Sequence, residues 1–356
     1  MNLYNLVMAG GGGTRFWPLS RKNMPKQLLS LSGKDVMINE TIIRCESLIK
    51  YSDTYIVTNI NQVKGIDNVL LKSIPRENIL SEPLAKNTAP CILYAIKYIL
   101  EAKGDGVVCV FPSDHYIEEK NGYLKILEKG IKLAESMNTI VTIGVIPKFP
   151  ATGYGYIEKS DDLIEENAYR IQRFVEKPNM VKAREYISTG NYFWNSGVFI
   201  FKISSLLEQF KRFLPRLYRA MSKLDGRILA EDSTDLLMQI YSEIDNISID
   251  YGIMERMDDA IVIPGDFGWN DVGSWDTLGT MFPTDDKGNI VNCDHVGVDT
   301  KECIIYGNKK LIATVGIYNT VVVDTNDAIL ICNKNRAQDV KQIVDILTEQ
   351  NRYDLL

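Results

Sequence analysis

The sequence predicts an α/β protein with a mostly parallel sheet, followed by a small separate β domain. Over the first two hundred residues, short apolar runs of strand character alternate with segments of helical periodicity. Such alternation is typical of a parallel sheet covered by helices on both faces. After about Phe282 the helical segments give way to short strand-like pieces separated by glycine and aspartate. We therefore expect two domains, 1–282 and 283–356, with the boundary in the stretch PTDDKGN.

Five strands are expected in the first domain, each followed by turn-forming residues: LYNLVMA, TYIVT, NILSE, GVVCVFP and TIVTIGV. Between the third and fourth strands, apolar residues recur at helical spacing, which predicts a helix from Thr88 to Leu100. Asn87 or Thr88 precedes this helix as a cap, and Pro90 falls in its first turn.

The second domain contains the strand-like pieces NIV, CIIYG, KLIATVG, TVVVDT and AILIC, and then a helix from Ala337 to Leu347. Apolar strands such as TVVVD would be a liability at an exposed edge of so small a domain. Self-association through this region is therefore expected.

Composition and charge exclude several classes of protein. The formal net charge is -6, with acidic and basic residues mixed along the chain and no basic tail, which argues against a nucleic-acid or membrane-surface binder. No apolar run is long enough to span a bilayer, and the N-terminus lacks the basic region of a signal peptide. The six cysteines form no CxxC pair and mostly lie in apolar runs such as VVCVF, as expected for reduced core residues of a cytoplasmic protein.

A glycine-rich stretch, GGGGTR, directly follows the first strand. Ligands of open α/β sheets bind at the carboxyl ends of strands, and consecutive backbone N–H groups there can form an anion-binding nest. The stretch fits neither the Walker A pattern nor GxGxxG. Four glycines alone would suit a flexible turn equally well. Arg15, Arg21, Lys22 and Lys26 crowd the following segment, however, and favour phosphate as the ligand.

Several segments, in this order, resemble those of bacterial mannose-1-phosphate guanylyltransferases: GGGGTRFWPLS with PKQLL, SEPLAKNTAP, FPSDHYI, ATGYGYIE, FVEKP, YFWNSGVFIF, SIDYGIMER and GWNDVGSW. The resemblance covers essentially the whole chain. It implies a Rossmann-like, GT-A-like nucleotidyltransferase domain with a mixed, mostly parallel sheet. It also implies a small C-terminal left-handed β-helix domain that forms a homodimer. The isomerase domain that many longer relatives carry is not expected here. The resemblance therefore predicts only the transferase step.

The implied reaction transfers GMP from GTP to mannose 1-phosphate and releases pyrophosphate. A phosphate monoester has a second pKa of about 6, so its oxygen attacks as an anion without a general base. Charge neutralisation and positioning must then supply the catalysis. The resemblance assigns Arg15 and Lys26 to the triphosphate and the leaving pyrophosphate, and Lys177 to the sugar phosphate. Arg21 and Lys22 are expected to be solvated surface charges.

Two aspartates are assigned by the resemblance to one Mg²⁺ ion. Asp114 follows the fourth strand in FPSDH, and Asp271 lies in the glycine-rich turn GWNDVG. Carboxylates, phosphate oxygens and water are the ligands that Mg²⁺ typically takes. From the residues alone, Asp114 would be a loop-start cap and Asp271 a turn residue. The neighbouring His115 is expected to form hydrogen bonds or pack, and not to hold metal.

The nucleotide is expected to bind at two places along the chain. The triphosphate is assigned to the loop residues Gly10, Gly11, Gly12, Gly13 and Thr14. Guanine needs an acceptor for its N1 and N2 hydrogens, which Glu82 of SEPLAKNTAP could supply. Asn87 and Thr88 could contact base or ribose, although helix capping explains both nearly as well.

Sugar recognition is assigned to residues of the middle of the chain. Glu176 of FVEKP can accept hydrogen bonds from two hydroxyls and Lys177 can reach the sugar phosphate, although an adjacent Glu and Lys is otherwise a common surface pair. Asn195 adds an amide that both donates and accepts. Gly153 and Gly155 would let the main chain approach the sugar.

Two alternative functions remain open. The same chemistry could act on another sugar 1-phosphate, such as a heptose, or on another nucleotide. A catalytically silent sugar-nucleotide sensor is the other possibility. The presence together of Arg15, Lys26, Asp114, Lys177 and Asp271 argues against a sensor, which is expected to have lost at least one of them.

Overall fold

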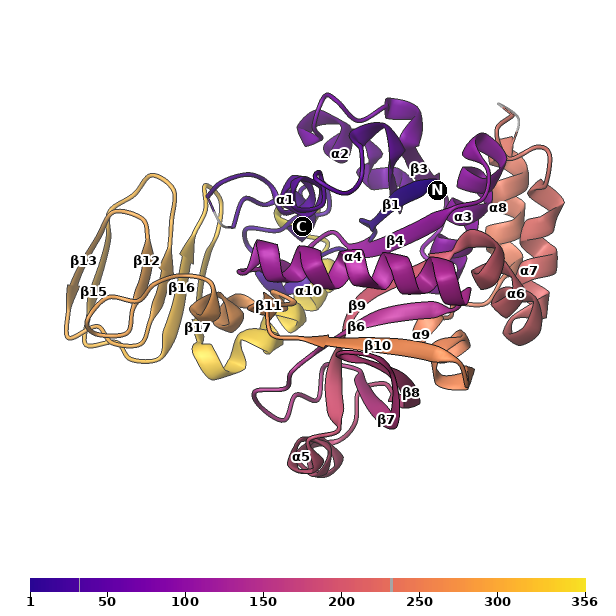
Figure 1. The fold of residues 1–356 in the computed structure, drawn as a ribbon. Helices are drawn as coiled ribbons and strands as arrows, with labels where there is room; N and C mark the ends of the chain where they lie inside the picture. Colours follow the sequence, from indigo (N-terminus) through magenta and orange to yellow (C-terminus); the bar gives the residue numbers. More distant parts are fainter. Residues whose placement is uncertain (32, 231–232) are drawn as a thin grey trace.

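The computed structural model describes residues 1–31, 33–230 and 233–356. Among these residues, the larger domain is built on a nine-stranded sheet of order β3-β2-β1-β4-β9-β6-β10-β8-β7 (Figure 1). Its strands are β1 Leu3–Met8, β2 Thr54–Asn59, β3 Ile79–Glu82, β4 Val107–Pro112, β6 Ile140–Val145, β7 Tyr156–Glu165, β8 Ala168–Val175, β9 Tyr192–Lys202 and β10 Ala260–Gly265. The pairings make β8 and β9 antiparallel to the others. The predicted mixed, mostly parallel sheet is confirmed.

The register of β1 and β4 decides where the site forms. The two strands are parallel and pair from Leu3 with Val107 to Met8 with Pro112. Their carboxyl ends are therefore level, and the glycine-rich loop and the FPSDH turn leave the sheet side by side. A motif at the start of the chain thus meets one that begins about a hundred residues later.

Helices cover both faces of the sheet. On one face, α4 crosses β4, β6, β9 and β10, while α1 and α2 pack beside β1. On the other face lie α3, α6 and α7 (Figure 1). The helices of this domain are α1 Met37–Arg44, α2 Val63–Val69, α3 Thr88–Lys103, α4 Lys120–Met137, α5 Met180–Thr189, α6 Ile203–Phe213, α7 Pro215–Met221, α8 Ser233–Glu243 and α9 Ile249–Gly252.

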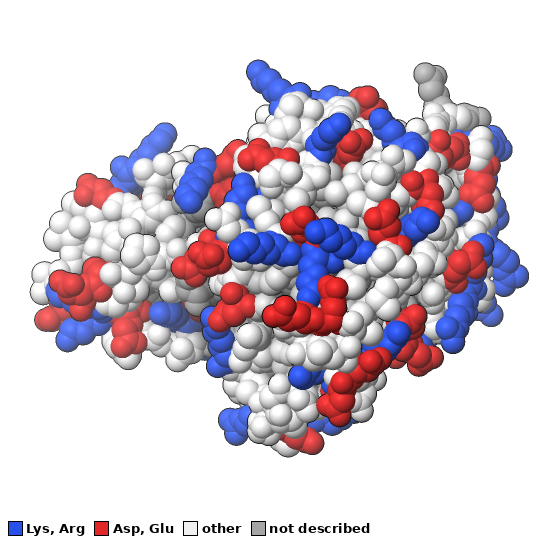
Figure 2. Space-filling model, in the orientation of Figure 1, with Lys and Arg blue, Asp and Glu red and all other residues white. Residues whose placement is uncertain are grey.

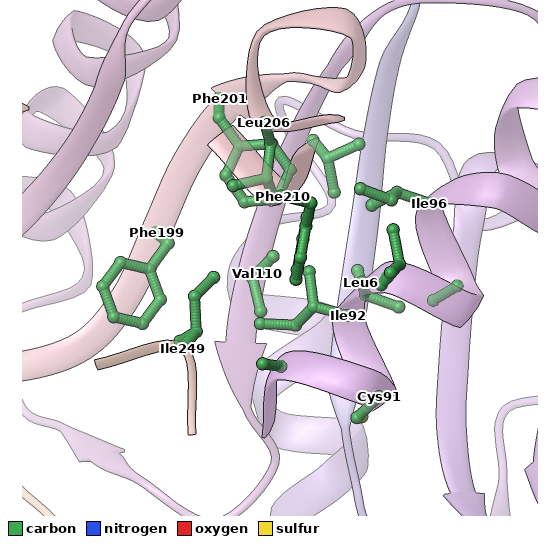
Figure 3. Close-up of a cluster of buried hydrophobic side chains, with 14 of the residues drawn as sticks. Leu6, Cys91, Ile92, Ile96, Val110, Phe199, Phe201, Leu206, Phe210 and Ile249 are labelled. Carbon is green, nitrogen blue, oxygen red and sulfur yellow. The ribbon is translucent and has the colours of Figure 1, made fainter. Parts of the chain in front are cut away.

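The helix predicted from Thr88 to Leu100 is α3, and it anchors the main core. The side chain of Asn87 accepts a hydrogen bond from Thr88 N at 2.9 Å, which caps the helix start. Ile92 and Ile96 then pack against the sheet and against α6 (Figure 3). Burying each such side chain contributes about 1.5–3 kcal/mol. This core therefore fixes the helix start against the strand ends.

The second domain consists of stacked short strands. Parallel pairings join β12 to β14, β14 to β16, and β13 to β15, whereas β17 pairs antiparallel with β16. Their bounds are β12 Ile290–Asn292, β13 His295–Val298, β14 Ile304–Tyr306, β15 Ile312–Val315, β16 Thr320–Asp324 and β17 Ile329–Asn333. The strand β13 was not predicted. The closing helix α10, Val340–Glu349, begins later than expected because a 3₁₀ turn, Lys334–Asp339, precedes it.

The expectation that TVVVD is exposed is wrong. This segment is β16, which pairs on both sides, and Val321 and Val323 are fully buried. Exposed apolar side chains lie on neighbouring strands, namely Val296 and Val298 of β13, Val315 of β15, and Ile329 and Ile331 of β17. The exposed apolar side chains of this domain therefore lie on strands other than the predicted one, and self-association stays a prediction.

Charged side chains of both signs are interspersed on the face shown in Figure 2, without a large area of one sign. The cysteines, all in the described part of the chain, are unpaired, and Cys45, Cys91, Cys109 and Cys303 are buried. Across the described ranges, the helices are all too short or too polar to cross a bilayer.

Candidate active site

A cavity of ≈ 490 Å³ lies at the carboxyl ends of β1 and β4. Its apolar wall includes Cys91, Phe199 and Ile249, which also belong to the main core (Figure 3). Many residues singled out in the sequence line it: Gly10, Gly11, Glu82, Asn87, Thr88, Gly153, Gly155, Glu176, Asn195 and Asp271. The structure thus gathers loop, guanine and sugar candidates and one metal candidate, Asp271, around one space, while Asp114 and Lys26 are not among its lining residues.

Lys26 joins the two aspartates at the centre of this region. Its Nζ donates to Oδ2 of Asp114 at 2.8 Å and to the backbone carbonyl of Asp271 at 2.7 Å. The lysine is only 5% exposed. An ammonium group buried to this degree needs such acceptors. Lys26 is consequently held beneath the site by both aspartate-bearing turns.

The conformation of Gly13 brings the loop onto Lys26. Gly13 has φ 62°, in the left-handed region, and a Cβ built on it would lie 2.4 Å from Lys26 Cβ. Only glycine therefore fits this position. Ser20 Oγ donates to the Gly13 carbonyl at 2.7 Å and closes the segment on itself.

A short strand pairing explains how distant turns meet. Residues Tyr116–Ile117 (β5) pair antiparallel with Trp269–Asn270 (β11), directly after Asp114 and before Asp271. Trp269 Nε1 donates to His115 Nδ1 at 3.2 Å, so the imidazole proton lies on Nε2. Burial lowers the pKa of His115, although the nearby Asp114 opposes this. His115 therefore lines the cavity as a neutral ring.

The two carboxylates fit a magnesium site that shares its ion with substrate. Lys26 occupies one oxygen of Asp114, and Tyr154 OH donates to Oδ1 of Asp271 at 2.8 Å, which leaves a second oxygen on each. Burial by itself raises the pKa of Asp114, but the charge of Lys26 outweighs it and the net pKa is lowered. In the ranges that the structure describes, no cluster of three or more metal-ligating side chains is found. One or two carboxylates completed by phosphate oxygens and water suit Mg²⁺.

The sugar candidates form a hydrogen-bonded group that includes Asp250, a residue not predicted. Asn195 Nδ2 donates to Oδ1 of Asp250 at 3.1 Å, and both side chains line the cavity with Glu176. A Cβ on Gly155 would lie 2.5 Å from Glu176 Oε2, so the missing side chain lets the carboxylate reach the backbone. Burial, with the nearby charge of Glu176, raises the pKa of Asp250 to about 6.

Lys177 lies beside this group but outside the cavity. Its Nζ donates to Glu176 Oε1 at 2.7 Å, and its side chain is 59% exposed. Partial burial would lower the pKa of Lys177, but the hydrogen bond and charge of Glu176 raise it overall. The lysine is thus available to a phosphate at the cavity's sugar end.

At the other end, Glu82 is held by internal partners. Tyr241 OH donates to its Oε1 at 2.9 Å, and burial raises the pKa of Glu82 to about 7 despite hydrogen bonds from Tyr241 and Cys91. Thr88 Oγ1 accepts from Ile249 N at 2.9 Å and so joins the helix start to α9. The capping interpretation therefore matches the hydrogen bond of Asn87, whereas the Thr88 side chain bonds to α9 and does not cap its own helix. Both residues also line the cavity.

Some predicted residues lie away from the cavity. Arg15 is exposed beside the loop, and Gly12 and Thr14 line a second, smaller hollow of ≈ 290 Å³ on the other side of the glycines. The glycine-rich loop thus separates two spaces, with Gly10 and Gly11 facing the larger one.

Asn87 lines the cavity, and Lys177 and Val272 each directly follow a lining residue. All three are non-glycine residues with positive φ, at 70°, 46° and 47°. Such conformations cost of order 1–3 kcal/mol each and gather at functional sites. A β-branched residue such as Val272 is a marked outlier, and it directly follows Asp271. Of the residues that sequence reasoning missed, Asp250 and Tyr154 lay in the quoted segments SIDYGIMER and ATGYGYIE, which were the available signal.

A mixed sheet with a glycine-rich loop and a cavity at its carboxyl edge agrees with the class that comparison with known proteins shows, that of the nucleotidyltransferases. The "Nucleotidyl transferase" family model matches residues 4–288, and that of the "MannoseP isomerase/GMP-like beta-helix domain" matches 293–347. The chain belongs to the mannose-1-phosphate guanylyltransferase family, as its relatives and a solved structure indicate.

One such relative is the "Mannose-1-phosphate guanylyltransferase" of Salmonella montevideo, 36% identical over 98% of this chain and 74% of that protein. The "Alginate biosynthesis protein AlgA" of Pseudomonas putida is 38% identical over 98% of this chain and 72% of that protein. A crystal structure from Thermus thermophilus, described as a "mannose-1-phosphate geranyltransferase", is 34% identical with a TM-score of 0.88. It covers 98% of this chain and 100% of the other.

Proposed function

We propose that this protein transfers GMP from GTP to mannose 1-phosphate and releases pyrophosphate, with GDP-mannose as the product. The observation that carries the proposal is the single cavity with a phosphate loop at one side and the Glu176, Asn195 and Asp250 group at another. The proposal puts the meeting point of the two substrates at Asp271, which lines this cavity and is joined to Asp114 through Lys26. The name of the Salmonella montevideo relative supports the choice of mannose and guanine, and that of the Thermus thermophilus structure supports mannose.

The reaction balances without a proton-transfer residue. An oxygen of the sugar phosphate attacks the α-phosphorus of GTP, a new P–O bond forms, and the bond from the α-phosphorus to the bridging oxygen breaks. Pyrophosphate carries away the electron pair. The attacking monoester is largely dianionic at neutral pH, since its second pKa is about 6. Catalysis by this chain is then the alignment of two anions and stabilisation of the charge on the departing group.

Each group of the site has a part in that alignment. Backbone N–H groups of Gly10 and Gly11, which line the cavity, are proposed to bind the triphosphate, with Arg15 for the leaving pyrophosphate. Lys26 holds the Asp114 and Asp271 turns at a fixed separation. Bound Mg²⁺, held by Asp114 and Asp271, would neutralise phosphate charge and template both substrates.

At the two ends of the cavity, polar groups select the substrates. Glu176, Asn195 and Asp250 supply acceptors and an amide for sugar hydroxyls, with Lys177 outside them for the sugar phosphate. Glu82, Asn87 and Thr88 are proposed to meet guanine and ribose. A site with polar groups left unpaired by the wrong base discriminates strongly against it.

Location and assembly are further parts of the proposal. Unpaired cysteines are expected in a reducing compartment, so we place the protein in the cytoplasm. The exposed apolar residues of β13, β15 and β17 support a homodimer formed through the second domain. Sedimentation as a monomer at micromolar concentration would contradict the dimer.

The test is pyrophosphate release with Mg²⁺ over a grid of GTP, ATP, UTP and dTTP against mannose, glucose, galactose and heptose 1-phosphates. Release confined to GTP with mannose 1-phosphate, and lost in Asp271→Asn, is the expected result. Release with another pair would keep the mechanism and change the substrates. No release from folded protein would overturn the proposal in favour of a sensor.

A further inference from the structure

Arg21 links the second domain to the segment that carries the phosphate loop. Its Nη1 donates to the Leu355 carbonyl at 2.9 Å, and its Nη2 donates to Asp327 Oδ1 at 2.7 Å. The side chain is 13% exposed, so the expectation that Arg21 is a solvated surface charge is wrong. One planar guanidinium thus fixes two separate segments of the second domain through charge-assisted hydrogen bonds.

Trp17 extends this link to the turn that bears Asp271. Its Nε1 donates to the same Leu355 carbonyl at 2.9 Å, and the Arg21 guanidinium lies 5.5 Å from its ring. The Trp17 carbonyl in turn accepts from Trp275 Nε1 at 3.2 Å. Trp275 is fully buried and four residues after Asp271. The C-terminal segment therefore holds the phosphate-loop segment and the aspartate turn against each other.

A second set of contacts leads from Arg21 to the glycine loop. Ser20, its neighbour in the chain, donates through Oγ to the Gly13 carbonyl at 2.7 Å. Gly13 rests on the Lys26 side chain, and Lys26 bonds to Asp114. A shift of Arg21 would therefore move the loop relative to the two aspartates.

We infer that Arg21 is a positioning residue, which uses the second domain to hold the glycine loop and Lys26 in the arrangement that the triphosphate requires. This inference rests on the proposed function. Arg21 is absent from the residues that line the ≈ 490 Å³ cavity, and it lines the smaller hollow with Gly12 and Thr14. Its guanidinium is taken up by Leu355 and Asp327, so we place its action on the loop and not on the sugar. The second domain is on this account a part of the catalytic apparatus as well as a surface for assembly.

The test is steady-state kinetics of Arg21→Ala with GTP and mannose 1-phosphate, well below the unfolding temperature of each protein. A small misplacement of reacting groups lowers kcat about 10- to 100-fold, and we expect a loss in this range. The KM for mannose 1-phosphate should stay within about twofold of the wild-type value. The reason is that the side chains proposed to bind the sugar, Glu176, Asn195 and Asp250, do not bond to the segment that carries Arg21. Arg21→Lys should restore activity only in part, since an ammonium lacks the fork that reaches both acceptors.

Arg336→Ala is the matched control. It also removes an arginine–aspartate pair of the second domain, Arg336 with Asp339, but the Arg336 side chain is 71% exposed. Its kcat should equal that of the wild type. A merely structural role for Arg21 predicts a lower unfolding temperature with an unchanged kcat, and that result would overturn the inference. An inactive wild type would overturn the proposed function instead.

If Arg21→Ala does not fold, Asp327→Asn replaces it in the same kinetic measurement. This change weakens the hydrogen bond from Arg21 to residue 327 and leaves the one to the Leu355 carbonyl in place. A several-fold loss of kcat at unchanged KM for mannose 1-phosphate supports the inference. A kcat equal to the wild type in both Asp327→Asn and Arg21→Lys contradicts it.

Discussion

Glu82→Gln should change how the stability of the protein depends on pH. Glu82 is 6% exposed, and burial raises its pKa from 4.5 to about 7. In the unfolded chain the same carboxyl titrates at its ordinary value. Between these values the folded protein holds a proton that the unfolded chain has lost, so stability falls as pH rises through this window. The contribution is complete below about 4.5 and is lost by the time the pH passes about 7.

The magnitude follows from the difference between the two pKa values. A rise from 4.5 to about 7 corresponds to about 3 kcal/mol at 1.36 kcal/mol for each pKa unit. Glutamine removes the titration but keeps an oxygen that can accept from Tyr241 OH. The free energy of unfolding of Glu82→Gln, relative to the wild type, should therefore increase by about 2.5 kcal/mol between about pH 5 and about pH 8, which is most of the full span.

Urea unfolding, followed by tryptophan fluorescence at several pH values, measures this difference. Glu243→Gln is the control, because Glu243 is 50% exposed and pairs with Lys223 on the surface. Its difference from the wild type should hardly vary with pH. If the Glu82→Gln difference is the same at low and high pH, the carboxyl titrates normally in the folded protein and the account of its burial is refuted.

Three further substitutions probe the centre and the two ends of the site. Lys26→Met leaves Asp114 without its cation, so kcat should fall about 10²–10³-fold while circular dichroism stays native; unchanged steady-state rates would contradict this. Asp250→Asn removes a group of pKa about 6. The variant-to-wild-type ratio of kcat/KM for sugar phosphate should approach one as pH falls through that value, because the wild type loses its carboxylate there. A ratio independent of pH would show that the ionised Asp250 carboxylate does not contribute to recognition of the sugar phosphate. Gly13→Ala forces a Cβ into Lys26, so it should lower the free energy of unfolding by about 1–3 kcal/mol and also lower kcat. Gly153→Ala is its control: the space around its Cβ is open, so the unfolding temperature should not change.

Local pattern predicted much of the larger domain. Short apolar runs and the capped helix at Thr88 correspond to β1 to β4, β6 and α3, because buried strands and an amphipathic helix have distinct periodicities. The position of the glycine stretch after β1 put it at the ligand-binding edge of the sheet, and Gly10 and Gly11 line the cavity there, while phosphate binding stays a prediction.

Contacts between distant segments were beyond such reasoning. The pairing of β5 with β11, which brings Asp114 near Asp271, involves two residues on each side and has no periodicity to detect. The inward direction of Lys26 depends on acceptors from two distant turns. The role of Arg21 is likewise invisible, because its partners come from the end of the chain. A lysine or arginine in a sequence is by default a surface charge, and only tertiary contacts overturn that expectation.

The most direct test of the central claim is ³¹P NMR of a mixture of GTP, mannose 1-phosphate and Mg²⁺ with the wild-type protein. As the mannose 1-phosphate and GTP signals decrease, those of a diphosphate-linked sugar nucleotide and of pyrophosphate should grow in equal amounts. Asp271→Asn, folded by circular dichroism, should leave the spectrum unchanged. Orthophosphate in place of pyrophosphate, or an unchanged spectrum with folded wild-type protein, would contradict it.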